Sequence, residues 1–222
     1  MKKYLLFIFL IFLLGCEGDK MKHKDVEIVT EDNLKISGDL YEGGEKGIIL
    51  LHQYTATKKI WRDFAEKMQE NGYSVLAIDF RGHGLSDLDY DDFSEKDFNN
   101  MIYDVKAAKE FLKKDEIIIV GASIGANIAL KFANEVDGVV LLSPGLNYKG
   151  IDIEEDASLV NKPVLIVVHD KDKYAYESSM KLENLIKNGE LKTYKGNKHG
   201  TYILDDETSE YVIRWVDNVL KL

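Results

Sequence analysis

Short apolar, β-branched runs recur along the chain. They lie at Val26–Val29, Gly47–Leu51, Ser74–Ile78, Ile117–Val120, Val139–Leu142 and Val164–Val168, with a weaker one at Leu191–Tyr194. Several are apolar throughout, which is typical of strands that are buried on both faces of a parallel sheet. Only Glu31-Asp32-Asn33 separates the first run from another strand candidate that ends at Tyr41, and this spacing predicts an antiparallel hairpin.

Helical patterns lie between these runs, at residues 61–68, 98–112 and 211–219. Ser94 and Asp97 stand ahead of the second pattern at the spacing of a capping box. An antiparallel entry followed by repeated strand–helix units predicts an α/β fold with a doubly wound, mostly parallel sheet. Ligands of such sheets bind beyond the carboxyl ends of the strands, so we expect the chemistry there.

The first residues have the pattern of a secretory signal. Lys2 and Lys3 precede an apolar run from Tyr4 to Leu14, which is shorter than the ~20 residues of a spanning helix. The segment Leu13-Leu14-Gly15-Cys16 resembles the lipobox of bacterial lipoproteins. This resemblance implies that Cys16 is lipidated and that the exported chain is anchored to the bacterial cell membrane. An ordinary signal peptide, or an uncleaved anchor that contains a cysteine, is the alternative.

These features divide the chain into three parts. We expect a lipoprotein signal peptide at residues 1–16, a polar tether at 17–24 and one α/β domain at 25–222. Cys16 is the only cysteine, so the exported domain would hold no disulfide. A net charge of −10 argues against nucleic acid as a partner, because phosphate binding needs clustered Lys and Arg.

A G-x-S-x-G sequence stands between a buried strand and a helical stretch. Gly121-Ala122-Ser123-Ile124-Gly125 directly follows the run at 117–120 and precedes the apolar residues 126–133. This order is that of a sharp strand-to-helix turn, the nucleophile elbow, which lifts the serine hydroxyl clear of the sheet. The helix N-terminus also favours negative charge that develops beside it. We therefore predict that Ser123 is a nucleophile.

The partners of such a serine follow it along the chain in the order acid, then histidine. The chain has five histidines: His23, His52, His83, His169 and His199. Only His199 lies late, in a polar loop between the last predicted strand and the last helix, so it is the candidate base. The acid is expected after Val168, where Asp170 and Asp172 both qualify. We favour Asp172 because it lies deeper in the loop.

An oxyanion hole needs two backbone N–H groups in this arrangement. Ile124, directly after the candidate nucleophile, supplies the first. The second is expected just after the run at 47–51, from Tyr54 or alternatively from Gln53. For the neighbouring His52 we expect a role in positioning this loop rather than in catalysis.

Two further segments carry a family resemblance. Ala77-Ile-Asp-Phe-Arg-Gly-His-Gly-Leu-Ser86 resembles the D-x-R-G-H-G-x-S segment of the α/β-hydrolase family, and Lys198-His-Gly-Thr201 resembles its histidine loop. The resemblance covers nearly the whole domain and is closest to small bacterial esterase-like and dienelactone-hydrolase-like members. It implies the α/β-hydrolase fold and a Ser123–Asp172–His199 triad with no metal and no cofactor.

The chain departs from the family at one position that bears on the site. Gln53 stands where the family usually has Gly after a histidine, so the geometry of the second oxyanion donor is open. Arg81-Gly-His-Gly84 has no cluster of further ligands in the sequence, so we expect a structural turn beside the site rather than a metal or phosphate loop.

The implied reaction is acyl transfer to water through an acyl-enzyme on Ser123. We expect a serine hydrolase that cleaves a carboxylic ester, or a thioester, of a small or short-chain acyl substrate. The stretch from Leu146 to Val160 is short and acidic, which predicts an open pocket and no large lid. The alternatives are a serine peptidase that acts on short peptides and a non-catalytic binding lipoprotein with the same fold.

Overall fold

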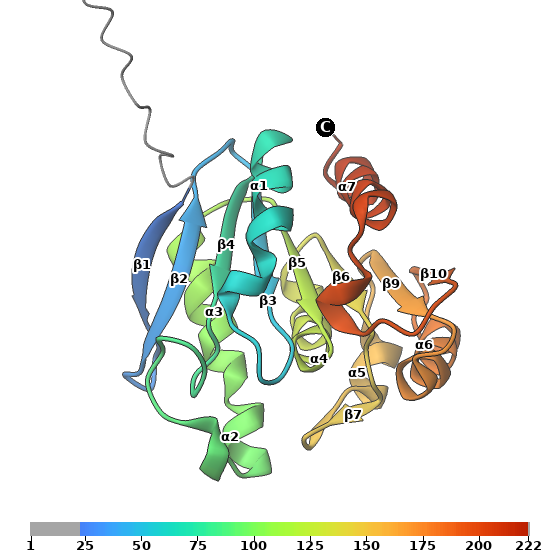
Figure 1. Ribbon diagram of the computed structural model, residues 1–222, viewed down its shortest axis with the longest axis horizontal. Coiled ribbons are helices and arrows are strands. Elements are labelled where there is room, and N and C mark those ends of the chain that lie inside the picture. Colours follow the sequence, from blue (N-terminus) through green and yellow to red (C-terminus); the bar gives the residue numbers. More distant parts are fainter. Residues whose placement is uncertain (1–22, 222) are drawn as a thin grey trace, which may run out of the picture.

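An eight-stranded sheet forms the centre of the computed structural model, which describes residues 23–221 (Figure 1). Its strand order is β1-β2-β4-β3-β5-β6-β9-β10. The strands are β1 (Lys24–Val29), β2 (Lys35–Tyr41), β3 (Gly47–Leu51), β4 (Ser74–Ile78), β5 (Ile117–Ala122), β6 (Gly138–Leu142), β9 (Val164–His169) and β10 (Gly189–Tyr194). β2 runs antiparallel to both β1 and β4, and the other neighbours are parallel. The predicted mostly parallel sheet with an antiparallel N-terminal hairpin is confirmed.

Both faces of the sheet are covered by helices, and the central strands, which are mostly apolar, are buried at every position. In β3, for example, Ile49 and Leu51 lie in one buried cluster, and Ile48 and Leu50 lie in the other. The first cluster includes residues of α3 (Met101–Leu112), α4 (Ile124–Lys131), α5 (Glu154–Leu159) and α6 (Lys173–Leu185). The second includes residues of α1 (Arg62–Glu70) and α7 (Asp206–Leu220), which lie on the same side of the sheet in Figure 1.

The helix predicted through residues 98–112 is two helices in the structure. The capping box forms as expected, with the Ser94 N–H donating to Asp97 Oδ2 over 2.9 Å. It begins the short helix α2 (Glu95–Asn99), however, and α3 starts afresh after Asn100. Asparagine is a poor helix former, because its side chain competes for backbone hydrogen-bonding groups. Here the side-chain amide of Asn99 donates to the Glu95 carbonyl.

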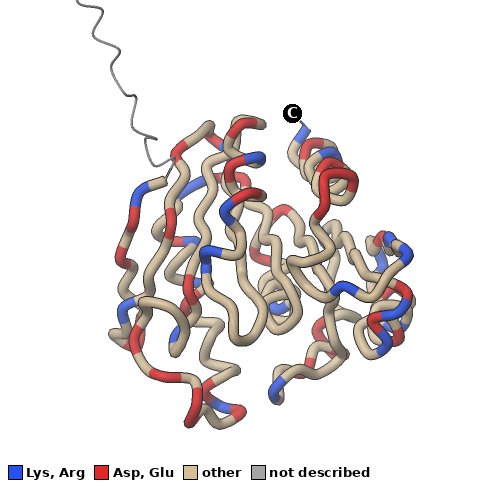
Figure 2. Tube along the Cα trace, viewed as in Figure 1, with Lys and Arg blue, Asp and Glu red and all other residues tan. Residues whose placement is uncertain are grey.

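The segment between β6 and β9 is small. It contains a hairpin of two two-residue strands, β7 (Asn147–Tyr148) and β8 (Ile151–Asp152), followed by α5. Figure 2 shows acidic and basic residues interspersed along most of the coloured chain. Within residues 23–221, no helix is long and apolar enough to cross a membrane. The predicted signal peptide, with Cys16, and most of the tether lie outside the described residues.

Candidate active site

Ser123 occupies the sharp turn between β5 and α4. Its φ of 53° and ψ of −118° are rare for a residue with a side chain, as expected for a nucleophile elbow. The flanking glycines allow a close approach, because a Cβ on Gly125 would lie 2.4 Å from the Leu51 carbonyl oxygen. A Cβ on Gly121 would lie 2.2 Å from the Gly125 oxygen. The Ser123 N–H donates to the Leu142 carbonyl over 2.8 Å, so the turn is held between β3 and β6.

The structure brings Ser123, His199 and Asp172 into one chain of hydrogen bonds. His199 Nε2 lies 2.8 Å from Ser123 Oγ, and His199 Nδ1 lies 2.6 Å from Asp172 Oδ2. Because the Asp172 carboxylate accepts from Nδ1–H, Nε2 is free to accept the serine proton. Asp170 points elsewhere, toward the Lys195 ammonium at 2.8 Å, and this hydrogen bond lowers the pKa of the Asp170 carboxyl.

Gln53, the departure from the family pattern, contacts the histidine loop. Its Oε1 accepts from the Thr201 N–H over 3.1 Å and from the Thr201 hydroxyl over 2.9 Å. Both side chains are buried. A residue from the end of β3 therefore fixes the backbone just after His199, which glycine could not do.

Two more buried side chains hold the same loop. The Gly200 N–H donates to Ser143 Oγ over 3.0 Å, and the Lys198 N–H donates to His169 Nδ1 over 3.0 Å. Burial lowers the pKa of His169, which keeps its acceptor nitrogen free of a proton. His199 is thus positioned by residues at the ends of β3, β6 and β9.

The predicted oxyanion donors are the backbone N–H groups of Ile124 and Tyr54. Within residues 23–221, the N–H groups of Ile124 and Tyr54 have no hydrogen-bond acceptor. His52 is fully buried and accepts from the Phe80 N–H at Nε2 over 3.0 Å, so its proton is on Nδ1. Nδ1 then donates to the Gln53 carbonyl over 2.8 Å, which orients the Gln53–Tyr54 peptide. Burial lowers the pKa of His52 to about 3, so it is a neutral positioning group.

A cavity of about 430 Å³ opens beside the histidine. The residues that line it are Gln53, Tyr54, Thr55, Ala56, Thr57, Ile60, His199 and Tyr202. It lies between the loop after β3 and the histidine loop, so the candidate base His199 and the loop that is expected to supply the second oxyanion donor border the same space. A small ligand in this cavity would lie next to His199.

Tyr148 was not anticipated from the sequence. Its ring meets the His199 ring edge-on at 6.2 Å between centroids, and its hydroxyl donates to the Ser143 carbonyl over 3.4 Å. Burial, together with the negative charge of Asp172, raises the pKa of Tyr148, so its hydroxyl keeps its proton. The Tyr174 hydroxyl accepts from the N–H of Asn147 at 3.0 Å and donates to its carbonyl at 2.9 Å, which fixes the hairpin that carries Tyr148.

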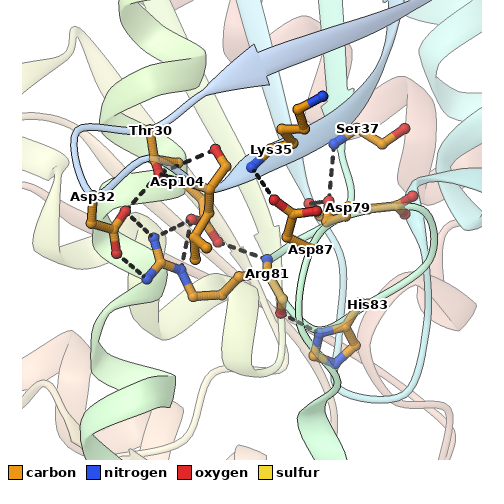
Figure 3. A network of polar contacts seen from close by, with 11 residues as sticks. Thr30, Asp32, Lys35, Ser37, Asp79, Arg81, His83, Asp87 and Asp104 are labelled. Carbon is orange, nitrogen blue, oxygen red and sulfur yellow. Dashed lines mark hydrogen bonds and ion pairs between the residues drawn. The ribbon is translucent and has the colours of Figure 1, made fainter.

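The segment after β4 forms a polar network outside the triad (Figure 3). Arg81 donates from Nε to Asp104 of α3 over 2.8 Å and from Nη1 to Asp32 of the β1–β2 turn over 2.7 Å. Burial opposes the charge on Arg81, but the hydrogen bonds to Asp32 and Asp104 outweigh it and raise its pKa. His83 Nδ1 lies 3.0 Å from the Arg81 carbonyl. The segment thus connects the end of β4 with α3 and with the β1–β2 turn, as a structural turn would.

A group of possible metal ligands lies at the far edge of the sheet. His23, Asp25 and Asp39 place one ligand atom each within 4.8 Å of one another. The buried Lys58 ammonium already pairs with Asp39, and it lies 3.4 Å from Asp25. A cation would have to displace this lysine, so the group fits an ion-pair cluster better than a metal site.

Comparison with known proteins extends these observations. A family model described as alpha/beta hydrolase fold matches residues 47–159, about half of the chain. The AB hydrolase superfamily protein YisY of Bacillus subtilis is 29% identical over 106 residues, which cover 46% of this chain and 38% of that protein. A thermostable monoacylglycerol lipase of Bacillus sp. strain H-257 is 27% identical over 115 residues, which cover 50% and 45%. The matched segments thus span less than half of these relatives.

Solved structures resemble nearly the whole described chain. The esterase Pf2001 of Pyrococcus furiosus superposes with a TM-score of 0.72 at 24% identity, covering 88% of this chain and 92% of that one. The esterase RhEst1 of Rhodococcus sp. ECU1013 superposes with a TM-score of 0.75 at 17% identity, covering 88% and 99%. At these identities the likeness establishes the fold, and the chemistry has to be argued from the site.

Proposed function

Because the chain belongs to the alpha/beta hydrolase fold family, we propose that it is a serine hydrolase that cleaves a carboxylic ester or thioester through an acyl-enzyme on Ser123. The observation that carries the proposal is the unbroken hydrogen-bond chain from Ser123 through His199 to Asp172. A binding protein that had lost turnover would have no need to keep all three groups at these distances. The esterases and the lipase among the similar proteins support an ester as the substrate class.

The proposed mechanism uses only groups of this chain and water. Ser123 Oγ attacks the substrate carbonyl while its proton moves to His199 Nε2, and Asp172 stabilises the resulting imidazolium. The N–H groups of Ile124 and Tyr54 bind the oxyanion. The ester bond breaks as His199 returns the proton to the leaving oxygen. Water then attacks the acyl-enzyme by the same sequence, which releases the acid and restores the Ser123 hydroxyl.

We also propose a small or short-chain acyl group. The cavity beside His199 measures about 430 Å³, and the segment over the site is a hairpin with a short helix. A chain-length series of 4-nitrophenyl esters tests this, and kcat/KM is expected to be highest for acetate to hexanoate. A maximum at dodecanoate or longer would contradict it.

The decisive experiment for the mechanism is labelling with a fluorophosphonate probe, which requires an activated serine. The full chain in mild detergent should be labelled at about one probe per molecule, and Ser123→Ala should not be labelled. Ser158→Ala, a change at an exposed serine of α5, serves as the matched control and should be labelled like the wild type. A folded wild-type protein that stays unlabelled, or is labelled elsewhere, would refute the acyl-enzyme.

The location of the enzyme is a separate proposal that rests on the Leu13-Leu14-Gly15-Cys16 segment. We propose that lipidated Cys16 anchors the exported chain to the bacterial cell membrane. Expression in a bacterial host with radiolabelled palmitate should label the wild-type chain in the membrane fraction. Cys16→Ser should abolish both the label and the membrane association. An unlabelled wild-type chain would favour an ordinary signal peptide.

A further inference from the structure

The tip of the β7–β8 hairpin is held in place over the candidate active site. Lys149 and Gly150 form its two-residue turn, with φ angles of 54° and 82°, as in the tight turns that match strand twist. Asn127 of α4, the helix that begins at the elbow, donates to the Ile151 carbonyl over 2.9 Å. Asn99 of α2 donates to the Gly150 carbonyl over 3.2 Å. The tip is thus attached to two helices, α4 and α2.

From this tip, Lys149 reaches across to the opposite wall of the site. Its ammonium lies 4.4 Å from the centroid of the Tyr54 ring and 5.7 Å from that of Phe98. Tyr54 also lines the cavity beside His199, and its N–H is a proposed oxyanion donor. The neighbouring residue in the hairpin, Tyr148, contacts His199. A positive charge therefore lies against the ring of Tyr54, a residue that lines the cavity where the substrate would bind.

This charge has no ionic partner within the described part of the chain. No carboxylate there comes within 4.0 Å of the Lys149 ammonium, although Glu95 packs against Gly150. Asp152, at the foot of the hairpin, instead accepts from the Glu154 N–H over 3.0 Å. A cation–π contact at an exposed site is weaker than a charge-assisted hydrogen bond to a carboxylate. An anionic group that entered the site would therefore be a better partner for Lys149 than the rings are.

The net charge of the chain also bears on anion binding. A chain with a net charge of −10 repels anions on balance, so an ammonium without an ionic partner beside Tyr54 would attract an anion locally. We propose that the substrate carries an anionic group, in the simplest case a carboxylate, which binds Lys149 while the ester carbonyl lies at Ser123. This rests on the proposed esterase function and names its substrate class.

Two pairs of esters test the proposal by turnover, and each differs only in charge. The first pair is the 4-nitrophenyl monoester of adipic acid and its methyl-capped form, with the charge on the acyl side. The second is 4-butyryloxybenzoate and its methyl ester, with the charge on the leaving group. In one of the pairs, kcat/KM of the wild type should favour the anion at least tenfold. Lys149→Gln should lower this ratio at least tenfold, and Lys149→Glu should reverse it.

Lys187→Gln is the matched control, because it removes one charge from an exposed lysine of the loop before β10. Its activity and its anion-to-neutral ratio should equal those of the wild type. Thermal unfolding of each variant shows whether it is folded. A wild type that prefers neither anion, or a ratio that Lys149→Gln leaves unchanged, would overturn the proposal.

A binding measurement separates this inference from the proposed function. Calorimetric titration of the full-length Ser123→Ala variant with the same esters requires no turnover. The preferred anion should bind at least tenfold tighter than its methyl ester, and Lys149→Gln in the Ser123→Ala background should remove the difference. If the wild type turns over no ester, the proposed function fails, and equal binding of anion and methyl ester still overturns the Lys149 subsite on its own.

Discussion

At the scale of single residues, Gln53 departs from the family pattern and has a structural role in the histidine loop. Its amide oxygen is the acceptor for the N–H and the hydroxyl of Thr201, and both residues are buried. Replacing it with the usual glycine would leave a buried N–H and a buried hydroxyl without an acceptor. A buried donor that loses its acceptor costs about 1–3 kcal/mol. The backbone that positions His199 would lose one of its supports.

We therefore expect Gln53→Gly to lower the free energy of unfolding by about 1–3 kcal/mol and kcat by roughly tenfold, with less change in KM. Thr201→Val removes the hydroxyl but keeps the N–H, so its effects should be in the same direction and smaller. Chemical denaturation and steady-state kinetics on a neutral ester measure both quantities. Full activity in a destabilised Gln53→Gly would show that the contact serves stability alone.

The site residues differ in whether the sequence alone predicts them. The G-x-S-x-G pattern placed Ser123 at the elbow, and chain order singled out His199, because both depend on local motifs and on topology. The structure sets Asp172 rather than Asp170 beside His199. The contact between Gln53 and Thr201 was beyond the sequence, since the two residues are 148 positions apart and no pattern links them.

At the scale of elements, the Arg81 network ties three segments together (Figure 3). The guanidinium lies between Asp104 of α3, which is fully buried, and Asp32 of the β1–β2 turn, which is about one third exposed. Removing one partner of a buried ion pair leaves an uncompensated charge, which costs about 3–5 kcal/mol. The position of α3 against the sheet therefore depends on Asp104 more than on Asp32.

We expect Asp104→Ala to lower the free energy of unfolding by about 3–5 kcal/mol at pH 7. Asp32→Ala, the matched change on the other side of the same guanidinium, should cost less, because water screens and solvates the exposed side. Urea denaturation of the two variants measures the difference. Equal losses, or a larger loss for Asp32→Ala, would contradict this account of the network.

Elements also differ in how well their patterns predict them. The strand at 47–51 and the strand at 74–78 have the predicted bounds, because each mostly apolar run ends at a polar residue, His52 or Asp79. The β7–β8 hairpin has strands of only two residues, so it shows no periodicity, and Lys149-Gly150 is a weak turn signal. For this reason the sequence did not predict that Tyr148 contacts His199, or that the Lys149 ammonium lies over the Tyr54 ring.

At the scale of the whole molecule, buried histidines make the fold sensitive to acid. Burial lowers the pKa values of His52, His83 and His169. In acid, the unfolded chain therefore binds more protons at these residues than the folded state does. Well above pH 6.5, where these groups are neutral in both states, they do not change stability. As the pH falls below 6.5, the unfolded state gains protons first and the free energy of unfolding decreases. For His52 this continues down to about pH 3.

The size of this effect can be isolated with one variant. Between pH 6.5 and 5, His52 alone should cost the folded state about 2 kcal/mol, since each unit of pKa difference corresponds to about 1.4 kcal/mol. Burial raises the pKa of Asp104 to about 6, which stabilises the fold in the same window and partly masks the histidine effect in the wild type. His52→Asn keeps Asp104 but cannot titrate, so Asp104 cancels when the two proteins are compared.

Urea denaturation at pH 7, 6 and 5 should therefore give a wild-type curve that falls by about 2 kcal/mol relative to that of His52→Asn. The absolute stability of the variant is immaterial, because the test is the difference in slope between the two proteins. Parallel curves would mean that His52 can take up a proton in the folded state. In that case its Nε2 would no longer accept from the Phe80 N–H, and the orientation of the Gln53–Tyr54 peptide at the oxyanion site would itself depend on pH.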